Sequence, residues 1–179
     1  YAAIVLQVRL PRVLLGGLVG MSLALTGGCF QGLFKNPMAD PYIIGVSSGA
    51  SLGAAVAIVF GLKLHLLGGN WAVVISAFIG SLLTVYVVYN IARVGGRIPV
   101  TTLLLAGVAV ASFLTSMVSF LVILGSKNMH GIIFWIMGSL AGSTWPLVIM
   151  ILPFCLLGAV VILAHARSLN GMLLGEDSA

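Results

Sequence analysis

Five long apolar runs alternate with short polar connections along the chain. The connections carry nearly all of the Lys, Arg, Asp and Glu residues, and the runs cover residues 12–34, 42–60, 71–92, 100–124 and 146–165. A bilayer crossing needs about 20 apolar residues, so each run can supply one membrane helix. Because the connections are short, successive helices should be antiparallel neighbours. The pattern predicts an all-α, polytopic transmembrane helical bundle of about five membrane helices.

A sixth apolar segment, residues 131–145, is shorter and is interrupted by Gly and Ser. It cannot cross a bilayer by itself, so we expect a half-helix or a re-entrant segment there. Trp135 and Trp145 lie on this segment. They fit an interfacial belt, in which an indole is apolar on one side and hydrogen-bonded on the other.

The second run is rich in Gly, Ser and Ala, which predicts a helix buried among its neighbours. Membrane helices associate through close backbone packing, and small residues four positions apart are the usual device. The pairs with this spacing are Gly16 with Gly20, Gly28 with Gly32, Gly45 with Gly49, Gly49 with Gly53, and Gly138 with Gly142. Their density in the first two runs predicts a tight helical core there.

Composition excludes an ordinary soluble domain. Of the 179 residues, 61% are hydrophobic and 6% are charged, whereas about a quarter of the residues in soluble domains are charged. The formal net charge of +5 belongs to the connections. We relate it to membrane topology and partner docking, and expect no nucleic-acid partner. Cys29 and Cys155 lie inside apolar segments and are interpreted as small packing residues.

The positive-inside tendency leaves the orientation of the chain undecided. One side of the membrane would hold Lys35, Arg93, Arg97 and Arg167, and the other would hold Arg9, Arg12, Lys63 and Lys127. Setting aside the pair Arg9 and Arg12 would place the Lys35 connection in the cytoplasm. The charge rule alone gives no reason to do so.

The chain carries no complete signature of catalysis or of ion coupling. Residues 45–49, GVSSG, match a G-x-S-x-G nucleophile pattern, but they lie in a predicted membrane helix and lack the strand and the His and Asp partners that such a site needs. No P-loop sequence and no Cys/His cluster occurs. We therefore expect no catalytic residue, cofactor or metal site. Because no charged residue lies well inside any run, an ion-coupled secondary transporter is disfavoured. A non-transporting scaffold is a further alternative.

A polar interruption, KNPMADP, occupies residues 35–41. Pro37 and Pro41 lack amide donors and push the residue before each of them out of helical geometry, so a break between two helices is expected. One interpretation is a connecting turn. The other is a gate, in which Asn36 and Met38 project toward a pathway.

Several motifs together resemble the membrane permease subunit of bacterial ABC importers for iron chelates, haem and cobalamin. They are RLPR (9–12), GMSLALTGGCFQGLFKNPMADPYIIGVSSGASLGA (20–54), LLLAGVA (103–109), FWIMGSLAG (134–142) and LNGMLLGEDSA (169–179). The resemblance implies about ten membrane helices in a complete protein. Residues 1–179 would form part of a single transmembrane permease domain, with the equivalents of the second to sixth helices and the start of a coupling helix.

The resemblance also implies a function and a set of partners. The chain would be a permease subunit, without an ATP site of its own, in a bacterial or archaeal inner membrane. It would work as a homodimer with two cytoplasmic ATPase subunits and a periplasmic or lipid-anchored substrate-binding protein. The substrate would be a metal chelate carried by alternating access. Ferric siderophore or haem is our first expectation, and cobalamin is the alternative.

The same resemblance assigns residues to four sites. Arg9 and Arg12 would dock the binding protein, although snorkelling to lipid headgroups is the other interpretation. Asn36, Met38, Val100 and Thr101 would form the cytoplasmic gate. Ser112, Thr115, Ser116 and Ser119 would line the pathway, unless these hydroxyls only bond their own helix. Leu174, Gly175, Glu176 and Asp177 would couple to the ATPase, with a solvated turn as the alternative.

Overall fold

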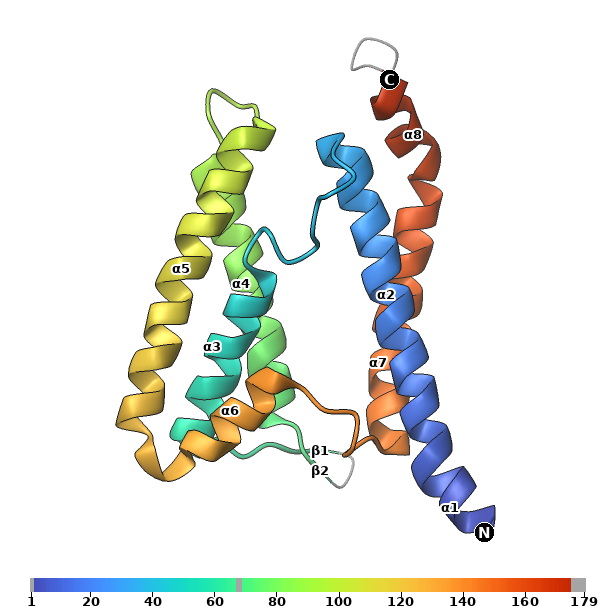
Figure 1. Ribbon diagram of the computed structural model, residues 1–179, viewed down its shortest axis with the longest axis vertical. Helices are drawn as coiled ribbons and strands as arrows, with labels where there is room; N and C mark the ends of the chain where they lie inside the picture. The colour runs from blue at the N-terminus through green and yellow to red at the C-terminus, as the bar shows by residue number, and fades with distance from the viewer. Residues whose placement is uncertain (1, 67–68, 175–179) are drawn as a thin grey trace. The chain divides into compact units, whose positions relative to one another are not determined.

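The computed structural model describes residues 2–66 and 69–174 (Figure 1). The described elements are α1 (Ala2–Ile4), the π-helical turn η1 (Val5–Arg9), α2 (Leu10–Phe34), α3 (Val46–Val59), β1 (His65–Leu66), β2 (Gly69–Asn70), α4 (Ala72–Ala92), α5 (Val100–Leu124), the 3-10 turn η2 (Ser126–Asn128), α6 (Met129–Met137), α7 (Trp145–Ala164) and α8 (Ala166–Leu174). The two short strands pair antiparallel between α3 and α4. The chain forms two compact units, one made of residues 42–138 and the other of the segments on either side.

Four helical segments in the described residues are long and apolar enough to cross a membrane: 2–34, 72–92, 100–124 and 145–164. The remaining predicted span, the second run at residues 42–60, forms a shorter helix than expected. Helix α3 has 14 residues, or about 21 Å at 1.5 Å per residue, against a hydrocarbon core of about 30 Å. Residues 42–45 form turns instead, and Gly45 takes a φ of +79° just before the helix. The GVSSG sequence thus follows a turn, whereas a nucleophile elbow would follow a strand.

In the unit of residues 42–138, α3 packs against both α4 and α5 (Figure 1). The contact with α4 is very close, because a Cβ atom at Gly53 would lie 2.7 Å from the Ser76 carbonyl carbon. Gly49 lies equally tightly against Thr84 of α4. The tight core predicted from small residues is therefore confirmed in this helix.

Two apolar clusters complete this unit. Ala55, Val118 and Ile132 join α3, α5 and α6, and a second cluster of Val88, Ala92 and Ala106 joins α4 and α5. Helix α6 is the predicted half-helix, but the predicted bounds of 131–145 are wrong. The helix begins earlier, at Met129, and ends at Met137, because Gly138 takes a φ of +70° that stops it.

The connection between α4 and α5, residues 93–99, contains a two-residue turn. Val94 and Arg97 exchange both backbone hydrogen bonds, at 2.9 and 3.0 Å. Gly95 and Gly96 between them have φ values of +57° and +81°, as a type I′ turn requires. Arg97 closes the turn, and Arg93 directly precedes it as the C-cap residue of α4.

In the other unit, α2 packs along α7, and its last turns also contact α8 (Figure 1). Ser22 of α2 donates a hydrogen bond of 3.2 Å to the sulfur of Cys155 on α7. The predicted glycine packing is not found along most of α2. Cβ atoms at Gly20, Gly28 and Gly32 would meet no described atom within 4 Å.

Candidate gate, pathway and docking sites

The break after α2 is a Schellman motif. Lys35 adopts a left-handed conformation with φ +50°. Its N–H donates to the Gly32 carbonyl at 3.3 Å, and the N–H of Asn36 donates to the Gln31 carbonyl at 3.1 Å. These two bonds satisfy carbonyls that the end of a helix leaves without partners. A lysine occupies a position that glycine usually takes.

Asn36 then directs the chain through a tight turn. Its side-chain oxygen accepts the N–H of Met38 at 2.9 Å, and its backbone carbonyl accepts the N–H of Ala39 at 3.1 Å. Pro37 lies between them and suits the second position of such a turn. The Met38 side chain is 85% exposed. Asn36 is therefore engaged in forming the turn, while Met38 is the residue that projects from it.

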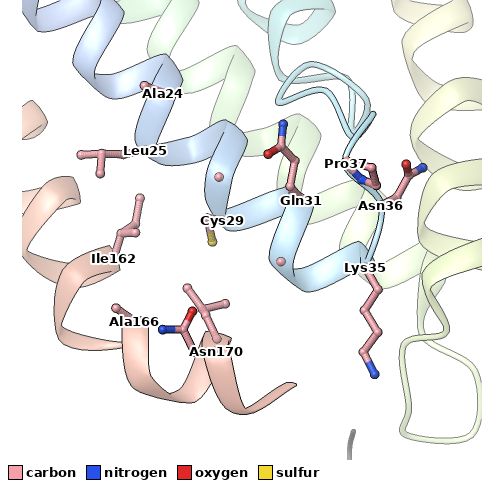
Figure 2. Close-up of a pocket in the computed structure, with 13 residues that line it drawn as sticks. Ala24, Leu25, Cys29, Gln31, Lys35, Asn36, Pro37, Ile162, Ala166 and Asn170 are labelled. Carbon is pink, nitrogen blue, oxygen red and sulfur yellow. The ribbon is translucent and has the colours of Figure 1, made fainter. Parts of the chain in front are cut away.

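A cavity of about 600 Å³ lies beside this break, between the end of α2 and the start of α8. Its polar lining includes Gln31 of α2, Lys35 and Asn36 of the break, and Asn170 of α8. Figure 2 shows the thiol of Cys29 facing α8 within this cavity. Among the described residues, no three His, Cys, Asp or Glu side chains come together as a metal site would require.

Val100 and Thr101 are the first two residues of α5. Pro99 precedes them with an extended ψ of 136°, so the helix starts sharply there. The side chains of both residues are exposed. They belong to the unit of residues 42–138, whereas Asn36 and Met38 belong to the other unit.

The four predicted pathway hydroxyls lie in consecutive turns of α5 and belong to exposed residues. Each donates to the carbonyl four residues earlier. The acceptors for Ser112, Thr115, Ser116 and Ser119 are Val108, Ala111, Ser112 and Thr115, at 2.8 to 3.1 Å. Such a hydroxyl oxygen still has acceptor capacity. The Thr115 hydroxyl oxygen also lies 3.4 Å from the hydroxyl oxygen of Ser48 on α3, and either hydroxyl could donate in this second hydrogen bond.

The two predicted docking arginines differ in their surroundings. A terminal nitrogen of Arg12 donates to the backbone carbonyl of Ala141 at 3.2 Å. Arg9 is exposed at the end of the π-helical turn, and within the described residues it has no hydrogen-bond or ion-pair partner. The resemblance gives both arginines one role, whereas within the described residues only Arg12 has a hydrogen bond to another part of the chain.

Sequence reasoning missed a contact between Trp145 and Leu6. The indole nitrogen of Trp145, at the start of α7, donates to the Leu6 carbonyl at 3.0 Å. Pro11 was only a partial signal, because in an ordinary α-helix its missing N–H would leave the Gln7 carbonyl unpaired, and the π-helical turn shifts the effect to Leu6. In the π-helical turn Leu10 donates to Val5, and the next donor in that pattern would be the N–H that Pro11 lacks.

The predicted coupling residues fall at the edge of the structure. Leu174 is the last residue of α8. Gly175, Glu176 and Asp177 lie outside the described residues. Helix α8 begins directly beyond α7, at Ala166.

Relatives of known sequence match along nearly the whole chain. A permease protein of an uncharacterised ABC transporter from Bacillus subtilis, YvrB, is 42% identical over all of this chain and 51% of its own length. The cobalamin import permease BtuC of Halobacterium salinarum is 46% identical over 98% of this chain and 46% of its own length. The hemin transport permease HmuU of Yersinia pestis is 38% identical over 97% of this chain and 52% of its own length. The chain thus spans about half the length of these relatives.

A solved structure has the same fold. It is described as an inward-facing conformation of a metal-chelate type ABC transporter, and it superposes with a TM-score of 0.88 at 31% identity over 98% of this chain and 55% of its own. The membrane permease relatives and the apolar helices make the chain a multi-pass protein of the inner membrane. All of residues 1–179 match the family described as the FecCD transport family, and the chain belongs to it.

Proposed function

We propose that the chain is part of the permease subunit of an ATP-driven importer for a metal chelate. The match of the entire chain to the FecCD transport family carries this proposal. The absence of Asp, Glu, Lys and Arg from the interior of the spans agrees with it, because a passive conduit driven by other subunits needs no ion-coupling group there.

The relatives' names support a metal chelate as the substrate. These relatives import cobalamin, hemin or Fe(3+)-citrate, and all three are metal chelates. Ferric siderophore or haem remains our first choice, with cobalamin as the alternative. The exposed hydroxyls on α5, with their acceptor capacity, suit passage of a polar chelate through an otherwise apolar helix bundle.

The transport cycle would be alternating access in a permease dimer. With the break at residues 35–41 in the cytoplasm, as the gate implied by the resemblance requires, Met38 would contribute to the inner end of the pathway, and so would Val100 and Thr101. Asn36 supports this gate by holding the turn that presents Met38. The segment after α8 would transmit the effect of ATP hydrolysis in the partner subunits to the membrane helices.

Reconstitution of the complete permease tests this function. Proteoliposomes would contain the permease and its cognate ATPase, with the binding protein outside, and uptake of ferric siderophore, hemin and cobalamin would be measured separately. We expect uptake of one chelate that requires ATP and survives dissipation of ion gradients. Uptake driven by an ion gradient without ATP would instead identify a secondary transporter. Absence of uptake with every partner combination would favour the non-transporting scaffold.

A further inference from the structure

Two adjoining cavities lie along α2. The first, of about 600 Å³, lies at the end of α2 and is also lined by residues of α7 and α8. The second, of about 250 Å³, lies between α2 and α7, beside Ser22 and Phe154. Leu25 and Ile162 line both cavities. We call the two together the α2 groove, and all of its lining residues belong to one compact unit of the chain.

The α2 groove changes from apolar to polar along its length. Leu25, Phe154 and Ile162 line its inner part, and Lys35 and Asn170 line its end. Figure 2 shows Leu25 opposite Ile162, and the Lys35 side chain extending past the end of α2. Among the described lining residues there is no Asp or Glu. The groove therefore combines apolar surface along the membrane helices with a positive charge that no lining carboxylate neutralises.

The length of the α2 groove matches one leaflet of a bilayer. From Ser22 to Phe34, α2 rises about 18 Å at 1.5 Å per residue, and one leaflet contributes about half of a hydrocarbon core of about 30 Å. Gly28 and Gly32 line the groove, and a Cβ atom at either would meet no described atom within 4 Å. Their missing side chains leave room along α2 for an extended acyl chain.

Lys35 occupies a backbone position that suits glycine better. Its φ of +50° is left-handed, and this conformation is strained for a residue with a side chain. The hydrogen bonds of the helix end use its backbone N–H, and those of the following turn use Asn36, so neither involves the Lys35 ammonium group. A strained residue whose side chain plays no part in the local fold points to a role for that side chain.

We propose that the α2 groove binds one anionic phospholipid. The Lys35 ammonium and the Asn170 amide hold the headgroup phosphate, and one acyl chain lies along Leu25 and Ile162. Lysine binds phosphate as a point charge, and a primary amide supplies two further donors. Basic pockets between membrane helices recognise anionic headgroups in this way. Placing the lipid in the cytoplasmic leaflet rests on the proposed function, whereas the binding itself does not.

Native mass spectrometry of the complete permease tests the headgroup site. The detergent-solubilised protein is titrated with phosphatidylglycerol and with phosphatidylcholine of the same acyl chains. We expect tighter binding of phosphatidylglycerol. Lys35→Gln should lower its affinity about fivefold, the factor expected for one cation near an anionic headgroup, and Lys35→Arg should retain it. Arg167→Gln is the matched control, because Arg167 is an exposed cation of α8 that does not line the groove, and it should have little effect.

A second pair of variants tests the acyl-chain part. Gly28→Leu should fill the groove and weaken binding of phosphatidylglycerol, whereas Gly20→Leu should not, since Gly20 also has open space but lies outside the lining. Size-exclusion chromatography checks that each variant is folded. If Gly28→Leu does not fold, the Lys35 variants decide the question.

Three results would overturn the lipid site. The first is equal affinity of the parent permease for the two lipids, as expected if another part of the complete protein covers the groove. The second is an equal loss in Arg167→Gln and Lys35→Gln, which would indicate general attraction to a basic surface. The third is competition by soluble glycerol phosphate as strong as by the lipid, which would indicate a site for phosphate alone. None of these measurements requires transport, so failure of the proposed importer function is detected separately.

Discussion

Gly53 of α3 lies directly against the backbone of Ser76 in α4, so that a Cβ atom on Gly53 would come within 2.7 Å of the Ser76 carbonyl carbon. Backbone cannot move aside as the end of a flexible side chain can. The close crossing of these two helices therefore depends on this glycine. It allows α3, the shortest of the apolar helices that match the predicted spans, to pack against two longer ones.

Replacing Gly53 by alanine should destabilise the permease by about 3 kcal/mol, because overpacking forces the two helix backbones apart. Gly17→Ala is the matched control: it lies in a helix, a Cβ atom there has open space, and alanine favours helix by about 1 kcal/mol over glycine. The thermal midpoint of the detergent-solubilised protein, followed by size-exclusion chromatography, measures both. Equal midpoints for the two variants would contradict the close contact.

Lys35→Gly should stabilise the protein by about 1 kcal/mol, because Lys35 occupies a left-handed conformation that costs a side-chain-bearing residue about that much. Lys35→Ala removes the same charge without relieving the backbone, so it serves as the control. Comparing the thermal midpoints of the two variants separates backbone strain from electrostatics. A midpoint for glycine no higher than for alanine would be inconsistent with the Schellman assignment.

A cysteine at Met38 should report the state of the proposed gate. Met38 is highly exposed and its side chain forms no part of the turn, whereas a cysteine at Asn36 would remove the bond that shapes it. In the complete transporter, the rate of maleimide modification at position 38 should change severalfold between the ATP-bound and nucleotide-free states. Lys63→Cys, on an exposed connection after α3, should react at the same rate in both. A constant rate at position 38 would reduce the loop to a static turn.

Gly175→Trp should uncouple ATP hydrolysis from uptake, because a bulky side chain would obstruct the fit of the proposed coupling segment to the ATPase. Assembly in the membrane should remain intact, since the substitution lies beyond the last described helix. ATPase activity and chelate uptake are measured in the same proteoliposomes. Normal uptake by this variant would remove the coupling assignment.

The helices themselves were largely predictable, because their limits depend on residues close in the chain. The predicted runs 71–92 and 100–124 correspond to α4 and α5 almost residue for residue, since apolar length, paired glycines and Pro99 act locally. The break at residues 35–41 was also predictable from its prolines. The early end of α6 was not, because nothing distinguishes Gly138 from the many glycines that helices tolerate until its positive φ is known.

The contacts between helices were decided by the tertiary structure. Glycines four residues apart occur in both α2 and α3, yet the α3 pair Gly49 and Gly53 is packed against a neighbouring backbone, while Gly28 and Gly32 of α2 have open space in the described residues. The spacing is the same, so it cannot identify which face another helix crosses.

Arg9 and Arg12 also illustrate the difference between what the sequence determines and what the tertiary structure decides. Their spacing and their position at the start of the first apolar run follow from the sequence alone, and so does the missing N–H of Pro11. That Arg12 bonds Ala141 and that Trp145 bonds Leu6 depends on residues more than 120 positions apart. Such partners are selected by the packing of α7 along α2, and helix packing is set by the shapes of whole faces, which no local pattern specifies.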